Sequence, residues 1–159
     1  MYNTQMNDVV DWLLKLCKNL NIKVTLSPSW LSNWPSRSLA SLRLIYYNPN
    51  WNPRYELPIS LAHEMGHVIT ESPDYNQLNS EVFNLKVEDA ADVIAIQLIL
   101  KYINLHDLHF ETETQLAETF AIPYYMLHDL DLVVKHQEQL KLLTNSTEFS
   151  NEGLFSLSM

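Results

Sequence analysis

The chain has 159 residues, of which 47% are apolar and 18% are charged, so it can bury one hydrophobic core and is too short for two full domains. Its formal net charge is -9, and the ten lysines and arginines are spread thinly, which excludes the dense positive patch that phosphate backbones require. We therefore expect no direct nucleic-acid ligand, and no run of 18 apolar residues marks a membrane span.

The first predicted element is an amphipathic helix over residues 4–20, where apolar side chains recur at helical spacing. Asp8 and Asp11 stand where a secretory signal would carry positive charge, so we expect a cytoplasmic protein. Cys17 is the single cysteine, which excludes an intramolecular disulfide framework and the cysteine-rich zinc sites. Any metal in this chain must therefore be held by histidine and carboxylate.

Two strands are predicted after this helix. Residues 22–27 alternate apolar and polar side chains, and residues 39–50 are rich in apolar and aromatic residues and end in a turn. Between them, residues 28–38 contain two prolines and several serines, which is typical of a long loop. Together these segments predict a small antiparallel sheet.

Helices are predicted in the rest of the chain. A proline in a helix interior costs roughly 3 kcal/mol, so the next helix should begin near Pro58 and end before Pro73. Residues 81–103 follow as a long helix, and residues 112–121 and 123–135 follow as two shorter ones.

The first of these helices contains LAHEMGHVIT, residues 61–70, with the spacing H-E-x-x-H. On a helix His63 and His67 lie one turn apart on one face, so both imidazoles can bind one ion at about 2 Å. Glu64 lies beside His63 and can reach a metal-bound water without being a ligand. The motif predicts a hydrolytic metal centre, and the alternative is an ordinary helix with histidines on its face.

A catalytic zinc ion needs a third protein ligand and an open fourth position. Glu71 continues the i, i+4 series, but three ligands on successive turns would span roughly 12 Å of helix axis and could not converge. In the helix predicted over residues 81–103, the segment VEDAADVIA places Glu88 and Asp92 one turn apart. We predict Glu88 as the third ligand and Asp92 as the acceptor for the second N–H of a ligand histidine.

Small residues are the remaining feature of these two helices. Gly66 lies inside the motif, although a glycine in a helix interior costs about 1 kcal/mol relative to alanine. We expect some feature of the site to need the side chain absent there, and the alternative is that Gly66 merely relieves a packing clash. Ala91 and Ala95 form a smooth strip that would let the second helix approach the first closely.

The segments LAHEMGHVI, VEDAADVIAIQLIL and QLAETFAIPYYMLHDL together resemble the ImmA/IrrE family of zinc-dependent endopeptidase-like proteins, many of which are carried by phages, prophages and mobile elements. The resemblance covers roughly residues 39–135. It implies that His63, His67 and Glu88 bind one Zn²⁺ per chain and that Glu64 is the catalytic glutamate.

The expected fold is α+β and zincin-like. A small antiparallel sheet should pack on the H-E-x-x-H helix and on a second, glutamate-bearing helix, and a helical C-terminal part should follow. We expect residues 1–144 to form a single zinc peptidase-like domain and the polar residues 145–159 to form a flexible tail.

The implied function is a zinc-dependent endopeptidase, in the cytoplasm of a bacterial host cell, that cuts a specific protein. By resemblance this substrate is a phage or mobile-element helix-turn-helix repressor, whose basic surface the acidic chain would attract. Glu64 would take a proton from zinc-bound water as that water attacks the peptide carbonyl. A second donor to the oxyanion is expected from Tyr124, Tyr125 or His128, among which the sequence does not select.

The alternative function is an anti-repressor or adaptor that binds the repressor without cutting it, with a structural or vestigial zinc site. A further reading takes QLAETFAIPYYMLHDL, residues 115–130, as a DNA-binding helix-turn-helix. The segment around it spans residues 104–140. Lys135 is the only lysine or arginine in this segment, against seven acidic residues, so phosphate would be repelled.

Two further features of the sequence are weaker indications of function. His106 and His109 have a spacing that permits a second metal, but no third ligand is evident and a solvated helix end explains them equally well. Three tryptophans flank the predicted cleft and are candidate substrate contacts: Trp30, Trp34 and Trp51.

Overall fold

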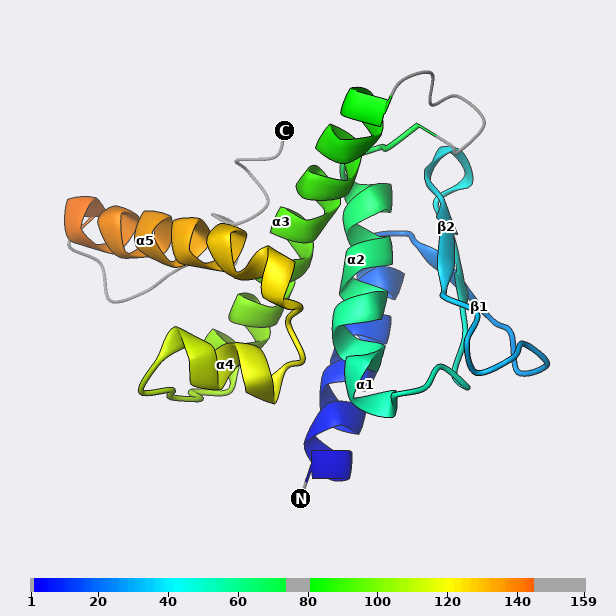
Figure 1. Cartoon of the computed structure of the whole chain (residues 1–159), viewed down its shortest axis with the longest axis horizontal. Helices are drawn as coiled ribbons and strands as arrows, with labels where there is room; N and C mark the ends of the chain where they lie inside the picture. Colours follow the sequence, from blue (N-terminus) through cyan, green and yellow to red (C-terminus); the bar gives the residue numbers. More distant parts are fainter. Residues whose placement is uncertain (1, 74–80, 145–159) are drawn as a thin grey trace.

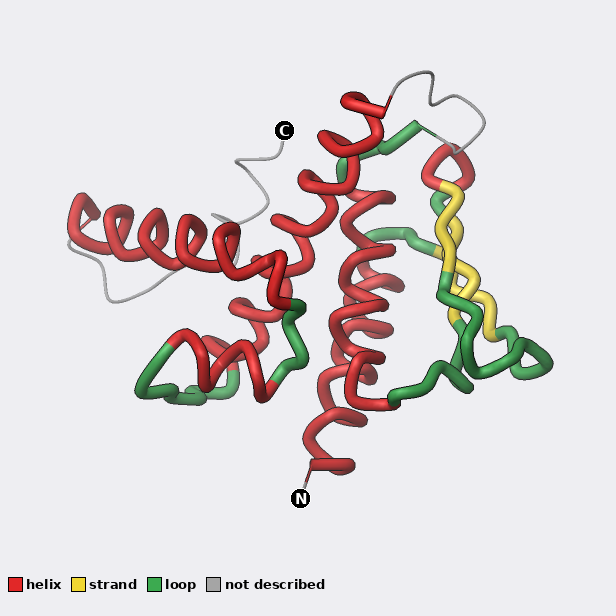
Figure 2. Tube along the Cα trace, in the orientation of Figure 1, coloured by secondary structure: helices red, strands yellow, loops and turns green. Residues whose placement is uncertain are grey.

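The fold is seen in a computed structural model that describes residues 2–73 and 81–144 (Figure 1). The tail expected over residues 145–159 lies outside the described residues. Helices dominate, and the strands gather on one side of the molecule (Figure 2). The main elements in chain order are α1 (Tyr2–Asn19), β1 (Lys23–Leu26), β2 (Arg37–Leu39), β3 (Leu44–Tyr47), α2 (Leu57–Ile69), α3 (Glu81–Leu105), α4 (Glu113–Thr119) and α5 (Leu127–Thr144).

The three strands form one sheet in the order β1-β3-β2. β2 pairs with β3 in antiparallel fashion, with Ser38 opposite Ile45, whereas β1 pairs with β3 in parallel, with Val24 opposite Ile45. The expectation of an antiparallel sheet is therefore wrong for the β1–β3 pair. Alternation of apolar and polar residues indicates which face of a strand is buried, but it does not indicate the direction of the neighbouring strand.

The strand expected over residues 39–50 is interrupted by a tight turn. Ala40–Leu42 form a 3-10 turn, and Arg43 follows with a left-handed φ of 48°. The turn reverses the chain between β2 and β3, so only Leu44–Tyr47 remain as the later strand. The Arg43 guanidinium donates to the carbonyl of Leu20 over 2.7 Å, which ties this turn to the end of α1.

The predicted helices are all present, with shifted ends. α2 carries Pro58 in its first turn and ends before Pro73, as predicted. α3 continues to Leu105, and α5 continues to Thr144 rather than ending at residue 135. Helix ends are less sharply marked in sequence than the apolar repeat that defines the helix body.

α2 lies between the sheet and α3, and α1 packs against it (Figure 1). The fully buried residues of α2 are Leu61, Ala62, Met65 and Val68, and those of α3 are Ala91, Ala95, Ile96 and Ile99. The α+β, zincin-like fold class is confirmed. The H-E-x-x-H motif therefore lies on a helix that is packed on both sides.

Gly66 lies where α2 contacts α3. A Cβ atom at this position would lie 2.4 Å from the carbonyl oxygen of Ala91 and 2.9 Å from its Cα. Since these are backbone atoms of α3, no rotation of a side chain could relieve the overlap. The missing side chain allows α3 to approach α2, and Glu88 stands three residues before Ala91 on α3.

Candidate metal centre

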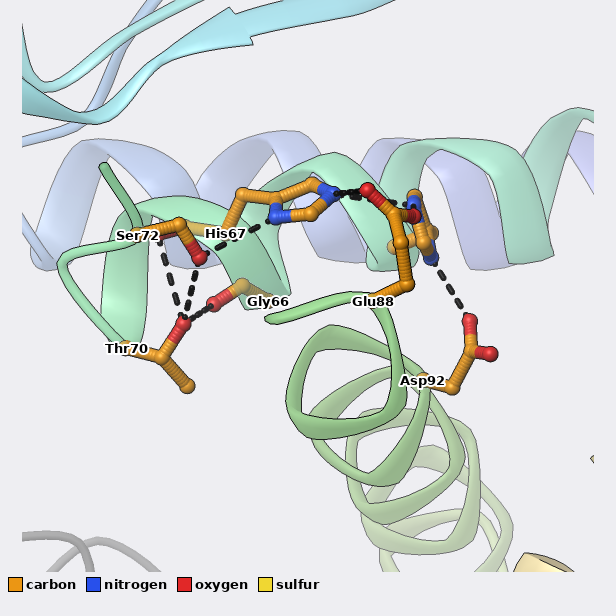
Figure 3. Close-up of polar contacts among 7 residues, drawn as sticks. Gly66, His67, Thr70, Ser72, Glu88 and Asp92 are labelled. Carbon is orange, nitrogen blue, oxygen red and sulfur yellow. Dashed lines mark hydrogen bonds and ion pairs between the residues drawn. The ribbon is translucent and has the colours of Figure 1, made fainter. Parts of the chain in front are cut away.

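Three side chains converge from α2 and α3. His63 and His67, one turn apart on α2, have Nε2 atoms 3.0 Å apart. From α3, Glu88 places Oε2 at 3.2 Å from Nε2 of His63 and Oε1 at 3.5 Å from Nε2 of His67. Figure 3 shows the Glu88 carboxylate reaching across from α3 toward His67. The two imidazole rings are perpendicular, with centroids 4.6 Å apart.

The spacing of these donor atoms fits one tetrahedral ion. Zinc bonds to histidine nitrogen and carboxylate oxygen are about 2.0–2.1 Å long, so two donors of a tetrahedral site lie about 3.3 Å apart. The three measured separations, 3.0, 3.2 and 3.5 Å, bracket that value. His63, His67 and Glu88 can therefore hold a metal ion. Within the described residues they form the one group of three such side chains this close together.

A buried carboxylate orients His63. Asp92 is 4% exposed, and its Oδ1 accepts the Nδ1–H of His63 over 2.8 Å. This hydrogen bond leaves the lone pair of His63 on Nε2, facing Glu88. Burial opposes protonation of His63, but the hydrogen bond to Asp92 and the nearby carboxylates raise its pKa above the usual value. Asp92 thus stands where a partner for a ligand histidine was predicted.

His67 differs from His63 in its electrostatics. Burial, reinforced by the neighbouring His63, lowers the pKa of His67. Its Nδ1 lies 3.1 Å from the hydroxyl oxygen of Ser72. A neutral imidazole has one nitrogen with a free lone pair, and that form is the one that binds metals.

Glu64 lies beside the three donors without being one of them. Its carboxylate lines the same cavity and accepts a hydrogen bond from the hydroxyl of Ser38 on β2. Burial raises the pKa of Glu64, while Ser38, His63 and Arg37 oppose that shift. Glu64 is therefore positioned to exchange a proton with a group in the cavity.

Ser38 and Ser72 were not identified from the sequence. Each is a serine among many, and each meets its partner only because the chain folds back on α2. The sheet edge brings Ser38 to Glu64, and the turn after α2 brings Ser72 to His67. No spacing pattern in the sequence marks either contact.

The cavity beside the donors has a volume of about 500 Å³. Its walls come from the loop before β2, from β2 itself, from α2 and from α3, and Trp30 and Tyr46 form one side. Of the three tryptophans expected at the cleft, only Trp30 lines it. Trp34 packs edge-on against Trp30, and the indole N–H of Trp51 donates to Glu56 over 3.0 Å.

The candidate oxyanion donors are not brought into this cavity. Tyr124 is 88% exposed, Tyr125 is 70% exposed, and His128 is also exposed. Burial of part of the ring, together with the carboxylates of Asp92 and Glu88, raises the pKa of Tyr125.

The second metal pair is not assembled within the described residues. The Nδ1–H of His106 donates to the carbonyl of Tyr102 over 2.9 Å, and the His106 ring stacks on the Tyr102 ring at 4.0 Å. The side chain of His109 is 84% exposed. Both histidines lie just beyond the end of α3, where His106 packs on Tyr102 and His109 is exposed to solvent.

Substitution of a donor is expected to abolish metal binding. His67→Ala and Glu88→Ala each remove one of three donors, so zinc affinity should fall by more than the roughly 10- to 100-fold typical of a supporting residue. Asp89→Ala is the matched control, because Asp89 is an exposed carboxylate next to Glu88 on α3. Metal content of the purified proteins, measured by mass spectrometry after dialysis, should be near one zinc per chain for the control. A donor variant that keeps its zinc would contradict the assignment.

Two histidines one turn apart on a buried helix, a glutamate from the next helix and a second glutamate beside them define a metallopeptidase-like protein. The family model described as the IrrE N-terminal-like domain, peptidase family M78, matches residues 17–129. The chain belongs to this family, which confirms the resemblance seen in the motifs. No curated protein and no solved structure matches the chain significantly. Across the described residues, no helix has the length and apolar character needed to cross a membrane.

Proposed function

We propose that the protein is a zinc-dependent endopeptidase that cuts a specific protein. One observation carries the proposal: Glu64 lines the same cavity as the three donors and is not needed to complete them. A carboxylate held beside a metal site, but outside it, is the arrangement that a general base requires. A site that only bound a structural ion would need no such group.

Zinc in this site would supply a Lewis acid that lowers the pKa of a coordinated water toward 7 and polarises the substrate carbonyl. Residues of the chain would carry out proton transfer and hold the reacting groups in position. The carboxylate of Glu64 takes a proton from the attacking water and passes it to the nitrogen of the leaving amine. The hydroxyl of Ser38 holds that carboxylate toward the cavity, and Asp92 holds the ring of His63 in place.

The cavity supports a peptide substrate. At about 500 Å³ it has room for side chains next to the scissile bond, and its lining includes Leu39, Ala40 and Val87. Trp30 stacks on Tyr46 with ring centroids 6.3 Å apart, which gives one side of the cavity a rigid aromatic wall. Among the described residues that line the cavity, Arg37 is the one lysine or arginine. These features favour an apolar side chain of the substrate beside the reacting carbonyl.

The proposed substrate is a helix-turn-helix repressor of a phage or mobile element. The family resemblance suggests this class of partner, and the net charge of -9 supports it, since a basic DNA-binding protein would be attracted at long range. Raising the ionic strength should therefore slow the association of the two proteins.

Incubation of the zinc-loaded protein with candidate repressors from the same genome tests the proposal. We expect a single pair of fragments by intact-mass spectrometry, loss of cleavage after chelation, and recovery when zinc is restored. A repressor that is bound tightly by the zinc-loaded protein and stays intact would instead support the non-cleaving anti-repressor. Cleavage that continues at full rate after complete removal of the metal would exclude the proposed chemistry.

A further inference from the structure

The end of α2 carries a chain of two hydroxyl groups that leads to His67. The helix ends in a tight turn, in which the amide of Glu71 donates to the carbonyl of Val68 over 3.2 Å and the amide of Ser72 donates to the carbonyl of His67 over 2.9 Å. Glu71 adopts a left-handed φ of 53°, a conformation that non-glycine residues rarely take up. The turn brings Ser72 back against the helix that it has just left.

Ser72 is buried there between two polar groups. It is 8% exposed, and its Oγ lies 3.1 Å from Nδ1 of His67 and 3.0 Å from Oγ1 of Thr70. Oγ1 of Thr70 in turn lies 2.8 Å from the carbonyl oxygen of Gly66. Figure 3 shows these contacts as successive dashed lines, from the carbonyl of Gly66 through Thr70 and Ser72 to His67.

The direction of each hydrogen bond in this series can be deduced by starting at the carbonyl oxygen of Gly66. A carbonyl oxygen can only accept, and a hydroxyl group has only one proton to give. Thr70 therefore donates to Gly66 and must accept from Ser72. Ser72 has then used its proton, so it can only accept from His67. The proton of the neutral His67 ring consequently lies on Nδ1, and the lone pair on Nε2 faces Glu88.

We propose that Ser72 and Thr70 are positioning residues that hold His67 in its metal-binding tautomer, as Asp92 does for His63. The proposal deepens the proposed function, because it concerns the metal centre on which that function rests. The two histidines are thus oriented by different means, a buried carboxylate for His63 and two neutral hydroxyls for His67. The hydroxyl pair orients the ring without adding a further negative charge to a site that already holds Glu64, Glu88 and Asp92.

Two substitutions test the two hydroxyl contacts separately, that of Ser72 with His67 and that of Thr70 with Ser72. Ser72→Ala removes the acceptor for Nδ1–H, so zinc affinity should fall about tenfold. Thr70→Val keeps the shape of the side chain but removes the acceptor for the Ser72 proton. Ser72 is then free to donate to Nδ1, which would move the ring proton to Nε2 and also weaken zinc binding. Ser72→Thr and Thr70→Ser retain the hydroxyls and are expected to keep the affinity of the wild type.

Matched control variants distinguish an effect on the orientation of His67 from a general effect of losing a buried serine or a helix-end hydrogen bond. Thr119 donates to the carbonyl of Gln115 over 2.8 Å at the end of α4, the same hydrogen bond that Thr70 makes at the end of α2. Thr119→Val should therefore leave zinc affinity unchanged. Ser27 is as buried as Ser72, at 8% exposed, and lies outside the cavity, so Ser27→Ala is the control for Ser72→Ala.

Two measurements test the proposed role of Ser72 and Thr70 without any substrate. Zinc affinity is measured by competition with a chromophoric chelator, and the tautomer of His67 is read from long-range proton–nitrogen spectra of the metal-free protein labelled with ¹⁵N-histidine. We expect the proton of His67 on Nδ1 in the wild type and a mixed or reversed tautomer in Ser72→Ala and Thr70→Val. The thermal midpoint of the metal-free protein shows whether a variant is folded.

The proposal is overturned if the wild type carries the His67 proton on Nε2. It is also overturned if Ser72→Ala and Thr70→Val bind zinc within about twofold of the wild type, since a positioning residue should cost more. Should Ser72→Ala fail to fold, Thr70→Val alone decides, because Thr70 is an exposed residue at the helix end. If the wild-type protein binds zinc but cuts no protein, the proposed peptidase function is wrong. The proposal about the tautomer of His67 is not affected by that result.

Discussion

Glu64→Gln is expected to lower kcat/KM for repressor cleavage by at least about a hundredfold while zinc binding is retained. Glutamine has the size of glutamate and can still accept the hydrogen bond from Ser38, so the local structure should persist. It cannot take up a proton from the attacking water, which is the proposed role of Glu64. Metal content should stay near one zinc per chain, because the three donors are untouched.

The matched control for this variant is Glu71→Gln. Glu71 is an exposed glutamate in the turn after the same helix, and the substitution removes the same charge without altering the cavity. Cleavage of a purified repressor is followed by intact-mass spectrometry over time with each protein. If Glu64→Gln cuts as fast as the wild type, Glu64 is not the general base. If it no longer cuts but still relieves repression in cells, binding alone is the biological function.

Gly66→Ala is expected to lower the free energy of unfolding by about 2 kcal/mol or more. This is opposite to the stabilisation that a glycine-to-alanine change in a helix usually gives. In an unobstructed helix interior, alanine is more stable than glycine by about 1 kcal/mol. Here the added Cβ would lie 2.4 Å from the carbonyl oxygen of Ala91. The helices α2 and α3 would have to separate along a buried contact, and that cost outweighs the gain in helix propensity.

The separation should also weaken the metal centre. Glu88 is carried by α3 and the histidines by α2, so a shift between the two helices lengthens the distances that Glu88 makes to His63 and His67. Urea denaturation of the metal-free protein measures the stability change, and chelator competition measures zinc affinity. Gly66→Ser should be no less destabilising than Gly66→Ala. An alanine variant more stable than the wild type would mean that α2 and α3 have room for a side chain.

The features that the sequence determined by itself are those that arise within one helix or from composition. His63 and His67 share a face because they are four residues apart, whatever packs against that helix. Pro58 and Pro73 limit α2 because proline cannot sit in a helix interior. The same reasoning placed Glu88 and Asp92 together on α3, and the paired motifs indicated the family that the match over residues 17–129 confirmed.

The tertiary structure decided everything that depends on how distant segments meet. The parallel pairing of β1 with β3, the contact of Ser38 with Glu64 and the return of Ser72 to His67 join residues whose spacing in sequence carries no periodic signal. Gly66 was conspicuous in the sequence, but only the packing of α3 across α2 shows which atoms exclude a side chain. Local backbone geometry follows from neighbouring residues, whereas these contacts result from the burial of a common core by the whole chain.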